Sequence, residues 1–322
     1  MFKRFLGLGL ALLMLALPAL SLADAPLTGA DGAQVTIAGE PQRIVALPVW
    51  AGEMLLDMVG PERIAGLSAW GDDPVISATA EKAAGVASRV ASSDLEGMIA
   101  LAPDLVVIDT FSDYDGSMAR TLRDAGVSVL MLESPTTFEA IEGCLLALGE
   151  ATGAQESAAR IAEDMRAELS EVAQRVAAVP EDARVRAMYY EDYYDATGAS
   201  AGMLCAYGAG STFQALCDAA GVVNVCDAPL YSAVSKEKVV GEWQPQLLVV
   251  PGITYGADFS AVFDGGEAAQ AGIAADETLA SLPAVQDGRI VALTECYRSS
   301  TSQYMVKAVR ELAQAAYPQL FE

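Results

Sequence analysis

Histidine does not occur in this 322-residue sequence. Its absence excludes mechanisms that use an imidazole as general base, and it removes the commonest nitrogen ligand for zinc. Cationic side chains are also scarce, because 19 lysine and arginine residues stand against 43 aspartate and glutamate residues, for a formal net charge of −24. Such an acidic surface repels nucleic acids and anionic membranes, so we expect no nucleic-acid partner.

The sequence motifs of common enzyme classes are missing as well. The chain has no GxSxG elbow, no P-loop, no GxGxxG after a predicted strand and no HExxH. The segment from Gly208 to Thr212 opens a predicted helix whose N–H groups would suit an anion, but ordinary helix capping explains it equally well. We therefore expect no catalytic residue, no metal site and no cofactor.

Cysteine occurs five times and never with CxxC spacing, which excludes a redox or zinc motif of that kind. Cys144 falls in a helical pattern and is expected to be a buried free thiol. The other four lie in the second half of the chain, where two disulfides are possible but the sequence does not determine their pairing: Cys205, Cys217, Cys226 and Cys296.

The first residues have the order of a secretory signal peptide. Lys3 and Arg4 precede an uncharged apolar run over residues 5–20, and the small residues Ala23 and Ala25 follow it. This order predicts a signal peptide over residues 1–25, cleaved after Ala23 or Ala25. No cysteine stands near that point and no second apolar run approaches membrane-spanning length, so we expect an exported, periplasmic protein without a lipid anchor.

The longest helical pattern without a strand lies between residues 137 and 180. Gly153 divides it into a shorter helix and one of about 25 residues, and Pro180 ends it. On both sides, over residues 26–136 and 181–322, short apolar strands alternate with helical patterns. This order predicts an α/β fold with two lobes, each built on a parallel sheet, joined by a long helix. A long surface helix inside one domain is the alternative.

Open parallel sheets bind ligands beyond the carboxyl ends of their strands, so the residues just after each predicted strand are the ligand-site candidates. In the first lobe these are Trp50, Trp70, Phe111 and Tyr114. In the second lobe they are Tyr193, Tyr194, Tyr207, Tyr231, Tyr255, Tyr297 and Arg298. Aromatic faces give a large contact area at little cost in entropy, although single tyrosines also simply cover sheet edges. Arg89 and Arg298 are the obvious basic candidates among many carboxylates, which favours a neutral or weakly charged ligand.

Five sequence segments resemble, in the same order along the chain, segments of the periplasmic binding proteins for vitamin B12, haem and ferric siderophores. They are PQRIVAL (41–47), IAGLS (64–68), LAPDLVV (101–107), AGVVNV (220–225) and LPAVQDGRI (282–290). The resemblance covers nearly all of the chain after the signal peptide. It implies the class III fold of two Rossmann-like lobes joined by a single long helix, a ligand in the cleft, and delivery to the permease of an ABC importer.

In that family a glutamate on each lobe docks onto arginines of the permease, and the matching residues here are Glu96 and Glu237. They hold corresponding places in a pattern found once per lobe, namely a helix, a proline, one polar residue and a four-residue apolar strand. Helix-start chemistry is the alternative explanation for Glu96, since Ser93 and Glu96 fit a capping box.

The resemblance also matches Trp70, Arg89, Tyr231, Tyr297 and Arg298 to cleft positions. Arg89 stands where a vitamin B12 binder often presents an aromatic residue, and the several arginines of catecholate binders are scarce here. Haem binders hold iron through histidine or tyrosine, so the absence of histidine leaves tyrosine as the route to haem.

We therefore expect a monomeric substrate-binding protein that captures a metal chelate, an iron–siderophore or similar iron complex, and presents it to an ABC permease. A corrinoid or haem ligand and an exported chelate-processing enzyme are the alternatives. A carboxylate and tyrosine site for free zinc or manganese is disfavoured. Because one long helix joins the lobes, we expect only a small closure on binding.

Overall fold

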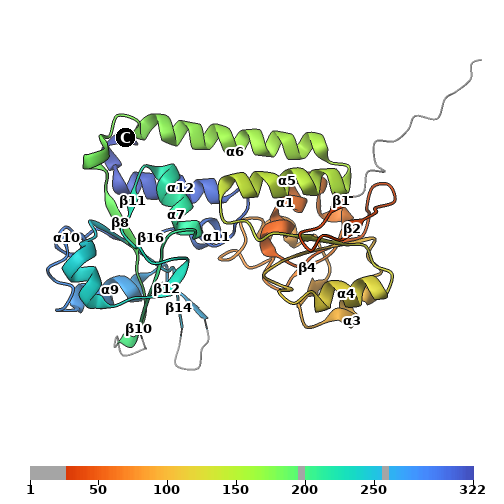
Figure 1. The fold of residues 1–322 in the computed structure, drawn as a ribbon, viewed down its shortest axis with the longest axis horizontal. Coiled ribbons are helices and arrows are strands. Elements are labelled where there is room, and N and C mark those ends of the chain that lie inside the picture. The colour runs from red at the N-terminus through yellow and green to blue at the C-terminus, as the bar shows by residue number, and fades with distance from the viewer. Residues whose placement is uncertain (1–26, 195–199, 256–260) are drawn as a thin grey trace, which may run out of the picture.

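The computed structural model describes residues 27–194, 200–255 and 261–322. Figure 1 shows two α/β lobes side by side, with the long helix α6 lying across both of them. No helix within these three ranges is long and apolar enough to cross a membrane.

The N-terminal sheet has five parallel strands in the order β5-β4-β3-β6-β7. They are β3 (Ile44–Ala46), β4 (Ile64–Ser68), β5 (Arg89–Val90), β6 (Leu105–Asp109) and β7 (Val129–Leu132). Helices α1 (Val49–Val59) and α5 (Phe138–Thr152) cover one face, and α3 (Leu95–Ala100) and α4 (Ser117–Asp124) cover the other. The strand order reverses between β3 and β6, and open sheets bind ligands at such reversals.

The C-terminal sheet has four parallel strands in the order β11-β8-β13-β16. They are β8 (Arg186–Tyr189), β11 (Val223–Asn224), β13 (Leu247–Val250) and β16 (Ile290–Ala292). Helices α7 (Thr212–Ala220) and α12 (Met305–Ala316) pack on one face, and α9 (Glu267–Ala275) and α10 (Pro283–Gln286) on the other. The order of this sheet reverses between β8 and β13.

Helices α5 and α6 (Gln155–Val176) connect the lobes. Gly153 ends α5 in the left-handed conformation, with a φ of 71°, which glycine adopts without strain. The chain then turns back into α6, whose 22 residues span about 33 Å at about 1.5 Å per residue. The predicted fold of two α/β lobes with parallel sheets and a long joining helix is confirmed.

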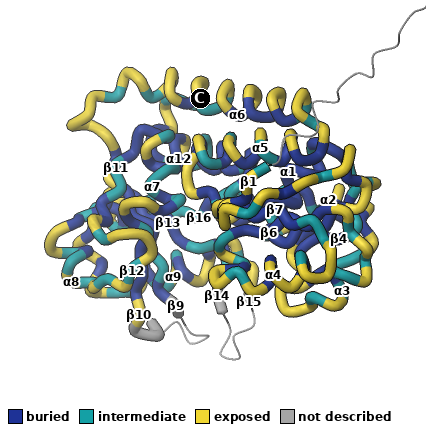
Figure 2. The backbone as a smooth tube through the Cα atoms, turned by 45° about the vertical axis from the view of Figure 1, so that its right-hand side comes forward, coloured by how far each residue is buried: buried dark blue, intermediate teal, exposed yellow. Residues whose placement is uncertain are grey.

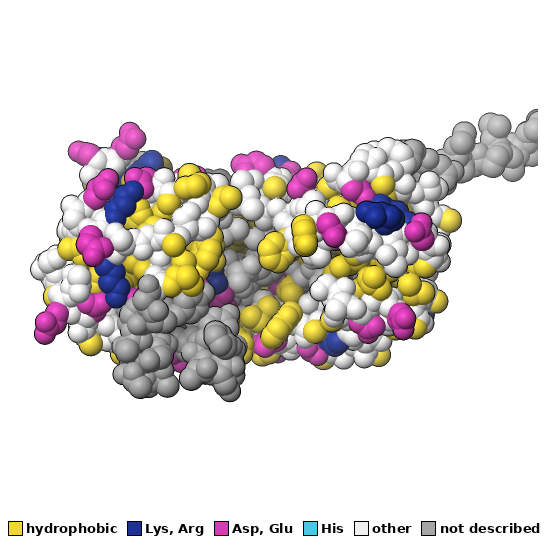
Figure 3. Space-filling model, turned by 60° about the horizontal axis from the view of Figure 1, so that its bottom comes forward, with side chains coloured by type: hydrophobic (Ala, Val, Ile, Leu, Met, Phe, Trp, Pro, Cys, Tyr) yellow, Lys and Arg dark blue, Asp and Glu magenta, His cyan; other side chains and the backbone are white. Residues whose placement is uncertain are grey.

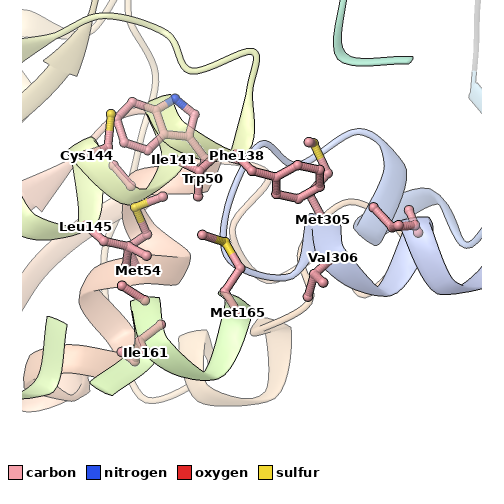
Figure 4. Packing of buried hydrophobic residues seen from close by; sticks show 14 of the residues in the cluster. Trp50, Met54, Phe138, Ile141, Cys144, Leu145, Ile161, Met165, Met305 and Val306 are labelled. Atoms are coloured by element: carbon pink, nitrogen blue, oxygen red, sulfur yellow. The ribbon is translucent and has the colours of Figure 1, made fainter. Parts of the chain in front are cut away.

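One layer of buried apolar side chains, which we call the shared core, lies against both sheets. Alternate strand residues supply it, such as Leu105 and Val107 from β6 and Leu247 and Val249 from β13, because neighbouring strand residues point to opposite faces. Figure 2 shows buried backbone running from one lobe to the other beneath α6, and Figure 4 shows residues of α1, α5, α6 and α12 meeting in this layer. The two lobes therefore share a core and do not meet only through a linker.

The stretches after β8 and β13, which hold predicted ligand-site tyrosines, are antiparallel strands. Strand β9 (Glu191–Tyr194) pairs with β10 (Ser200–Tyr207), which also pairs with β12 (Tyr231–Ala233). Strand β14 (Ile253–Tyr255) pairs with β15 (Ala261–Phe263). Tyrosine favours strand pairing, and the chain stays extended past each parallel sheet. A separate short hairpin is formed by β1 (Leu27–Thr28) and β2 (Gln34–Val35).

All five cysteines are buried free thiols. Burial raises the pKa of Cys144 to about 12, and the nearby carboxylates of Asp109 and Glu133 add to the effect. Cys217 lies in the shared core, whereas Cys226 packs on the opposite face of the C-terminal sheet. The free thiol predicted at Cys144 is confirmed, and the disulfides that the sequence left open are not formed.

Replacing Met165 of α6 with alanine should destabilise both lobes together. Met165 is 2% exposed, and Figure 4 shows it between Met54 of α1 and Val306 of α12. Truncating a buried methionine costs about 2–5 kcal/mol. Because the core is shared, we expect a single unfolding transition at a lower urea midpoint, measured by circular dichroism.

Glu163→Ala, on the exposed side of the same helix, is the matched control. It should change the free energy of unfolding by about 0.5 kcal/mol or less. Two transitions, only one of which Met165→Ala moves, would contradict the shared core.

Candidate functional site

The carboxyl edges of the two sheets face each other. A groove of about 590 Å³ lies between the start of α5, the side of α6 and the start of α7. At the carboxyl edges themselves, Glu53 of α1, which follows β3, accepts a hydrogen bond from Ser300, which follows β16 in the other lobe. Figure 3 looks onto the side from which the β9-β10 and β14-β15 hairpins project, and it shows hydrophobic side chains on both sides of a hollow between the lobes. Residues that follow the strands of both sheets therefore come together here.

Three predicted aromatic residues of the N-terminal lobe are strongly exposed. Trp70 follows β4 and is 57% exposed, while Phe111 and Tyr114 follow β6 and are 86% and 89% exposed. The backbone below them is held, since the Phe111 N–H donates to Ser134 Oγ at 3.2 Å. The N-terminal lobe therefore presents three large aromatic rings to the solvent.

Trp50 is buried and offers no ring face to a ligand, which corrects its prediction as a ligand contact. It is 6% exposed, and Figure 4 shows it inside the shared core beside Cys144. Its indole N–H donates to Asp109 Oδ2 at 3.0 Å. The same carboxylate accepts hydrogen bonds from Ser112 and Ser134. Trp50 therefore orients Asp109, which in turn holds the loop after β6 in place.

Arg89 holds its own segment in place. Its guanidinium donates to the carbonyl oxygens of Ala83, Val86 and Ser88 at 2.8, 2.8 and 3.1 Å, and it pairs with Asp72 at 2.9 Å. The Ala83 carbonyl belongs to the end of α2 (Ala80–Ala83), so Arg89 caps that helix. With these groups engaged, Arg89 presents little charge to a ligand.

Aromatic rings form a ladder from the shared core to the rim of the C-terminal lobe. Ring centroids lie 5.6 Å apart between Phe213 and Tyr189, 5.0 Å between Tyr189 and Tyr207, and 4.7 Å between Tyr207 and Tyr231. Exposure rises from 2% at Phe213 to 44% at Tyr231. Each ring holds the next, so Tyr231 is a preorganised aromatic face. Burial raises the pKa of Tyr207, and the Glu191 carboxylate adds to this, so Tyr207 stays a neutral phenol near pH 7.

Arg298 lies beside this ladder, at the end of α11 (Glu295–Arg298). Its guanidinium carbon is 4.9 Å from the centroid of the Tyr189 ring, and it forms an ion pair with Glu295, whose side chain is 5% exposed. Tyr297 packs against the shared core, with the Lys307 ammonium 5.0 Å from its ring centroid. Because the Glu295 charge offsets that of Arg298, this part of the site carries little net charge.

Sequence reasoning missed three residues of this arrangement: Phe213, Tyr189 and Glu295. Phe213 lies in a predicted helix and Tyr189 in an apolar strand, and no sequence signal sets either of them apart there. Glu295 was visible in principle, because its i, i+3 spacing from Arg298 on a short helix is typical of an ion pair.

The side chains of Tyr193, Tyr194 and Tyr255 lie outside the described residues, although their backbones belong to β9 and β14. Their roles in ligand binding stay predictions.

The glycine cluster before α7 is explained by helix capping and close packing. Ser211 Oγ accepts a hydrogen bond from the Gln214 N–H at 3.2 Å, which caps the helix. A Cβ on Gly208 would lie 1.7 Å from the Ala228 carbonyl oxygen, so only glycine fits at that position.

The two glutamates matched to permease docking are exposed, and each lies in the first turn of a helix. Glu96 is in α3, and Glu237 is in α8 (Lys236–Lys238). The expected capping box of Ser93 and Glu96 is wrong, because Asp94 is the cap and its Oδ1 accepts from the Gly97 N–H at 2.8 Å. The Glu96 carboxylate is therefore not engaged in capping.

The backbone around these glutamates is fixed in both lobes. Lys236 pairs with Asp192 at 3.0 Å and Lys238 with Asp227 at 2.6 Å, on either side of Glu237. Ala102 and Gln244, which precede the prolines of the repeated pattern, have unusual positive φ angles of 46° and 44°. The pattern therefore has the same backbone turn in both lobes.

Comparisons with known proteins agree with this architecture. A model described as periplasmic binding protein matches residues 53–297. The uncharacterized ABC transporter substrate-binding lipoprotein YvrC of Bacillus subtilis is 25% identical over 154 residues, 48% of each chain, so the match spans about half of that lipoprotein. A cobalamin-binding protein of Halobacterium salinarum is 23% identical over 292 residues, 90% of this chain and 74% of that protein. The periplasmic heme-binding protein RhuT from Roseiflexus sp. RS-1 has the same fold, with a TM-score of 0.69 at 21% identity, covering 88% of this chain and 100% of RhuT.

Removing Arg298 alone should destabilise the protein more than removing the whole ion pair. Arg298→Met leaves the Glu295 carboxylate buried without its partner, and breaking a buried pair in this way costs about 3–5 kcal/mol. The double variant with Glu295→Gln removes both charges and should recover part of that loss. Urea unfolding of the parent, both single variants and the double variant measures the coupling. If the double variant is no more stable than Arg298→Met, the two side chains are not coupled as described.

Proposed function

Because this chain belongs to the periplasmic binding protein family, we propose that it captures a metal chelate between its lobes and delivers it to the permease of an ABC importer. An iron–siderophore or similar iron complex is the proposed ligand, bound by a monomer and released unchanged. The family implies a place outside the cytoplasm. The predicted signal peptide over residues 1–25 fits that location, although it lies outside the described residues.

The observation that carries the proposal is the exposure of aromatic rings beyond the strand ends of both sheets. Trp70, Phe111 and Tyr114 are exposed in the N-terminal lobe, and Tyr231 in the C-terminal lobe. Rings of this size rarely stay exposed in a soluble protein without a partner. A ligand with a broad apolar face, held between two lobes, would cover them.

The charges around the hollow favour a complex with little negative charge. Arg89 is engaged with three carbonyl oxygens and Asp72, and Arg298 with Glu295. A highly anionic catecholate complex would need cations that are not already paired. Neutral hydroxamate complexes meet this condition.

A corrinoid or haem ligand is the second candidate of the same class. A flat macrocycle would stack on the exposed rings, and the names of two similar proteins refer to cobalamin and heme. Tyrosine serves as a haem-iron ligand in other proteins, and Tyr231 is the exposed tyrosine at the end of the ladder.

Glu96 and Glu237 are proposed to dock the protein onto basic residues of the permease. Both carboxylates are exposed, both belong to the same repeated pattern, and the backbone around each is fixed by capping or ion pairs. A carboxylate held in this way loses little entropy when it meets a partner.

The purified protein should bind one ligand class from a panel of cyanocobalamin, haemin, and ferric hydroxamate and catecholate siderophores. Calorimetry gives the affinity, and fluorescence reports through Trp70, since Trp50 and Trp243 are buried. Phe111→Ala and Tyr231→Ala should each weaken binding about tenfold, because each removes a ring face worth roughly 1.4 kcal/mol.

Leu146→Ala is the control, because Leu146 is also apolar and 45% exposed but lies on α5. It should leave the affinity unchanged. Binding to no member of the panel would defeat the chelate proposal. Mass spectrometry of the released ligand distinguishes a binding protein from an exported chelate-processing enzyme. A binding protein returns the chelate unchanged, whereas an enzyme would release a chemically altered chelate.

Charge reversal at the two docking positions should block delivery without affecting capture. Glu96→Arg and Glu237→Arg should each reduce cellular uptake of the ligand identified above by at least about tenfold, because like charges meet at the interface. Calorimetry on the same variants should give the parent affinity. Glu163→Arg, on the exposed face of α6, is the control and should support normal uptake. Normal uptake by both docking variants would exclude this role for them.

A further inference from the structure

Glu53 is a buried carboxylate that contacts both lobes. It belongs to α1, where it is surrounded by the shared core and only 1% exposed. Its Oε1 accepts hydrogen bonds from Ser77 Oγ at 3.2 Å and from the Ala78 N–H at 2.6 Å, both in the N-terminal lobe. Its Oε2 accepts hydrogen bonds from the hydroxyls of Ser300 and Ser302 in the C-terminal lobe. One carboxylate thus joins the lobes through its two oxygens.

A carboxylate in this place is stable only while its donors stay within reach. Burial raises the pKa of Glu53, and the hydrogen bonds from the three serine hydroxyls and the Ala78 N–H oppose that shift. The three serines are themselves at most 6% exposed, so water does not readily replace them. Moving the lobes apart at this point would leave Oε2 buried without a donor, which carries a large desolvation penalty.

Asp57 makes a second connection one helical turn further along α1. Its Oδ2 accepts hydrogen bonds from Gln303 Nε2 at 2.8 Å and from the Tyr304 hydroxyl at 2.7 Å. Its Oδ1 pairs with Lys82 of its own lobe at 2.5 Å. Each of the two carboxylates therefore uses one oxygen for each lobe, and together they hold the segment 300–304.

The held segment links the ligand site of the C-terminal lobe to the shared core. Arg298 ends α11 two residues before Ser300, and α12 begins at Met305, which is fully buried in the shared core. A shift of this segment against α1 would move the end of α11, and with it the guanidinium that lies over Tyr189.

We propose that Glu53 is a positioning residue that fixes the angle between the two lobes. Its carboxylate holds the segment 300–304 against α1 and so sets the place of Arg298 at the edge of the hollow. The shared core keeps the lobes together, whereas the hydrogen bonds to Glu53 select one relative orientation, because they are directional and the apolar contacts are not. This role does not depend on which ligand is bound.

Distances between the lobes in ligand-free protein test the proposal, measured by pulsed electron paramagnetic resonance. Spin labels at Arg120→Cys on α4 and Ala274→Cys on α9 report on the two lobes, since both positions are exposed and the five native thiols are buried. Ser302→Ala removes a donor that reaches Glu53 from the opposite lobe. Ser77→Ala removes the same chemical group from the same carboxylate, but within the N-terminal lobe, and is the matched control.

We expect Ser302→Ala, and more strongly Ser300→Ala with Ser302→Ala, to broaden the inter-lobe distance distribution about twofold by populating further orientations. Ser77→Ala should lower the unfolding midpoint while the distribution stays that of the parent. Glu53→Gln should broaden the distribution as well, and the serine variants keep the test valid if that protein does not fold. Unchanged distributions in the Ser300 and Ser302 variants, or equal broadening by Ser77→Ala, would overturn the proposal.

Discussion

The apolar layer beneath α6 is the constraint on which the rest of this structure depends. Each sheet turns one face toward it, and the helices that cover those faces belong to a single cluster of buried residues. Neither lobe buries its inner face alone, so the packing of α1, α6 and α12 keeps the two lobes together. A wide hinge motion would expose this layer to water, which is why a small closure is the expectation. Within the lobe pair that this layer holds together, the hydrogen bonds to Glu53 are proposed to select the orientation in which the carboxyl edges of the sheets face each other.

At the carboxyl edge of the sheets, buried carboxylates and exposed aromatic rings have different roles. Asp109, Glu295 and Glu53 are buried carboxylates, and each is occupied with loop donors, with Arg298, or with serines of both lobes. Buried charges of this kind hold loops in one conformation, because a lost donor leaves an unsatisfied acceptor. These three carboxylates are already engaged in hydrogen bonds or ion pairs, whereas aromatic rings such as Phe111 and Tyr231 are exposed at this edge. This arrangement supports the proposed ligand with a broad apolar face.

The sequence predicted those features that depend on local pattern. Parallel sheets, the division at Gly153 and the repeated pattern around Pro103 and Pro245 all follow from apolar spacing and from glycine and proline chemistry. The positive φ angles of Ala102 and Gln244 within that pattern were not predicted. Features that depend on distant contacts were not predictable. The burial of Trp50 requires Asp109, 59 residues away, and Glu53 meets Ser302 across 249 residues. The cap at Asp94 in place of Ser93 shows the usual uncertainty of a helix boundary by one residue.

The chain has a net charge of −24, and several of its few cationic side chains are engaged in hydrogen bonds within the fold. Four arginines each donate to carbonyl oxygens at the end of a helix: Arg43 at α3, Arg63 at α5, Arg89 at α2 and Arg289 at α12. A guanidinium there satisfies carbonyls that the helix leaves unpaired, and its charge offsets the negative end of the helix dipole. These arginines stabilise the fold and add little positive potential to the surface, so carboxylates such as Glu96 and Glu237 dominate the field that a partner meets. For the docking proposed at Glu96 and Glu237 the permease surface would have to be basic, and the proposed ligand would have to carry little negative charge.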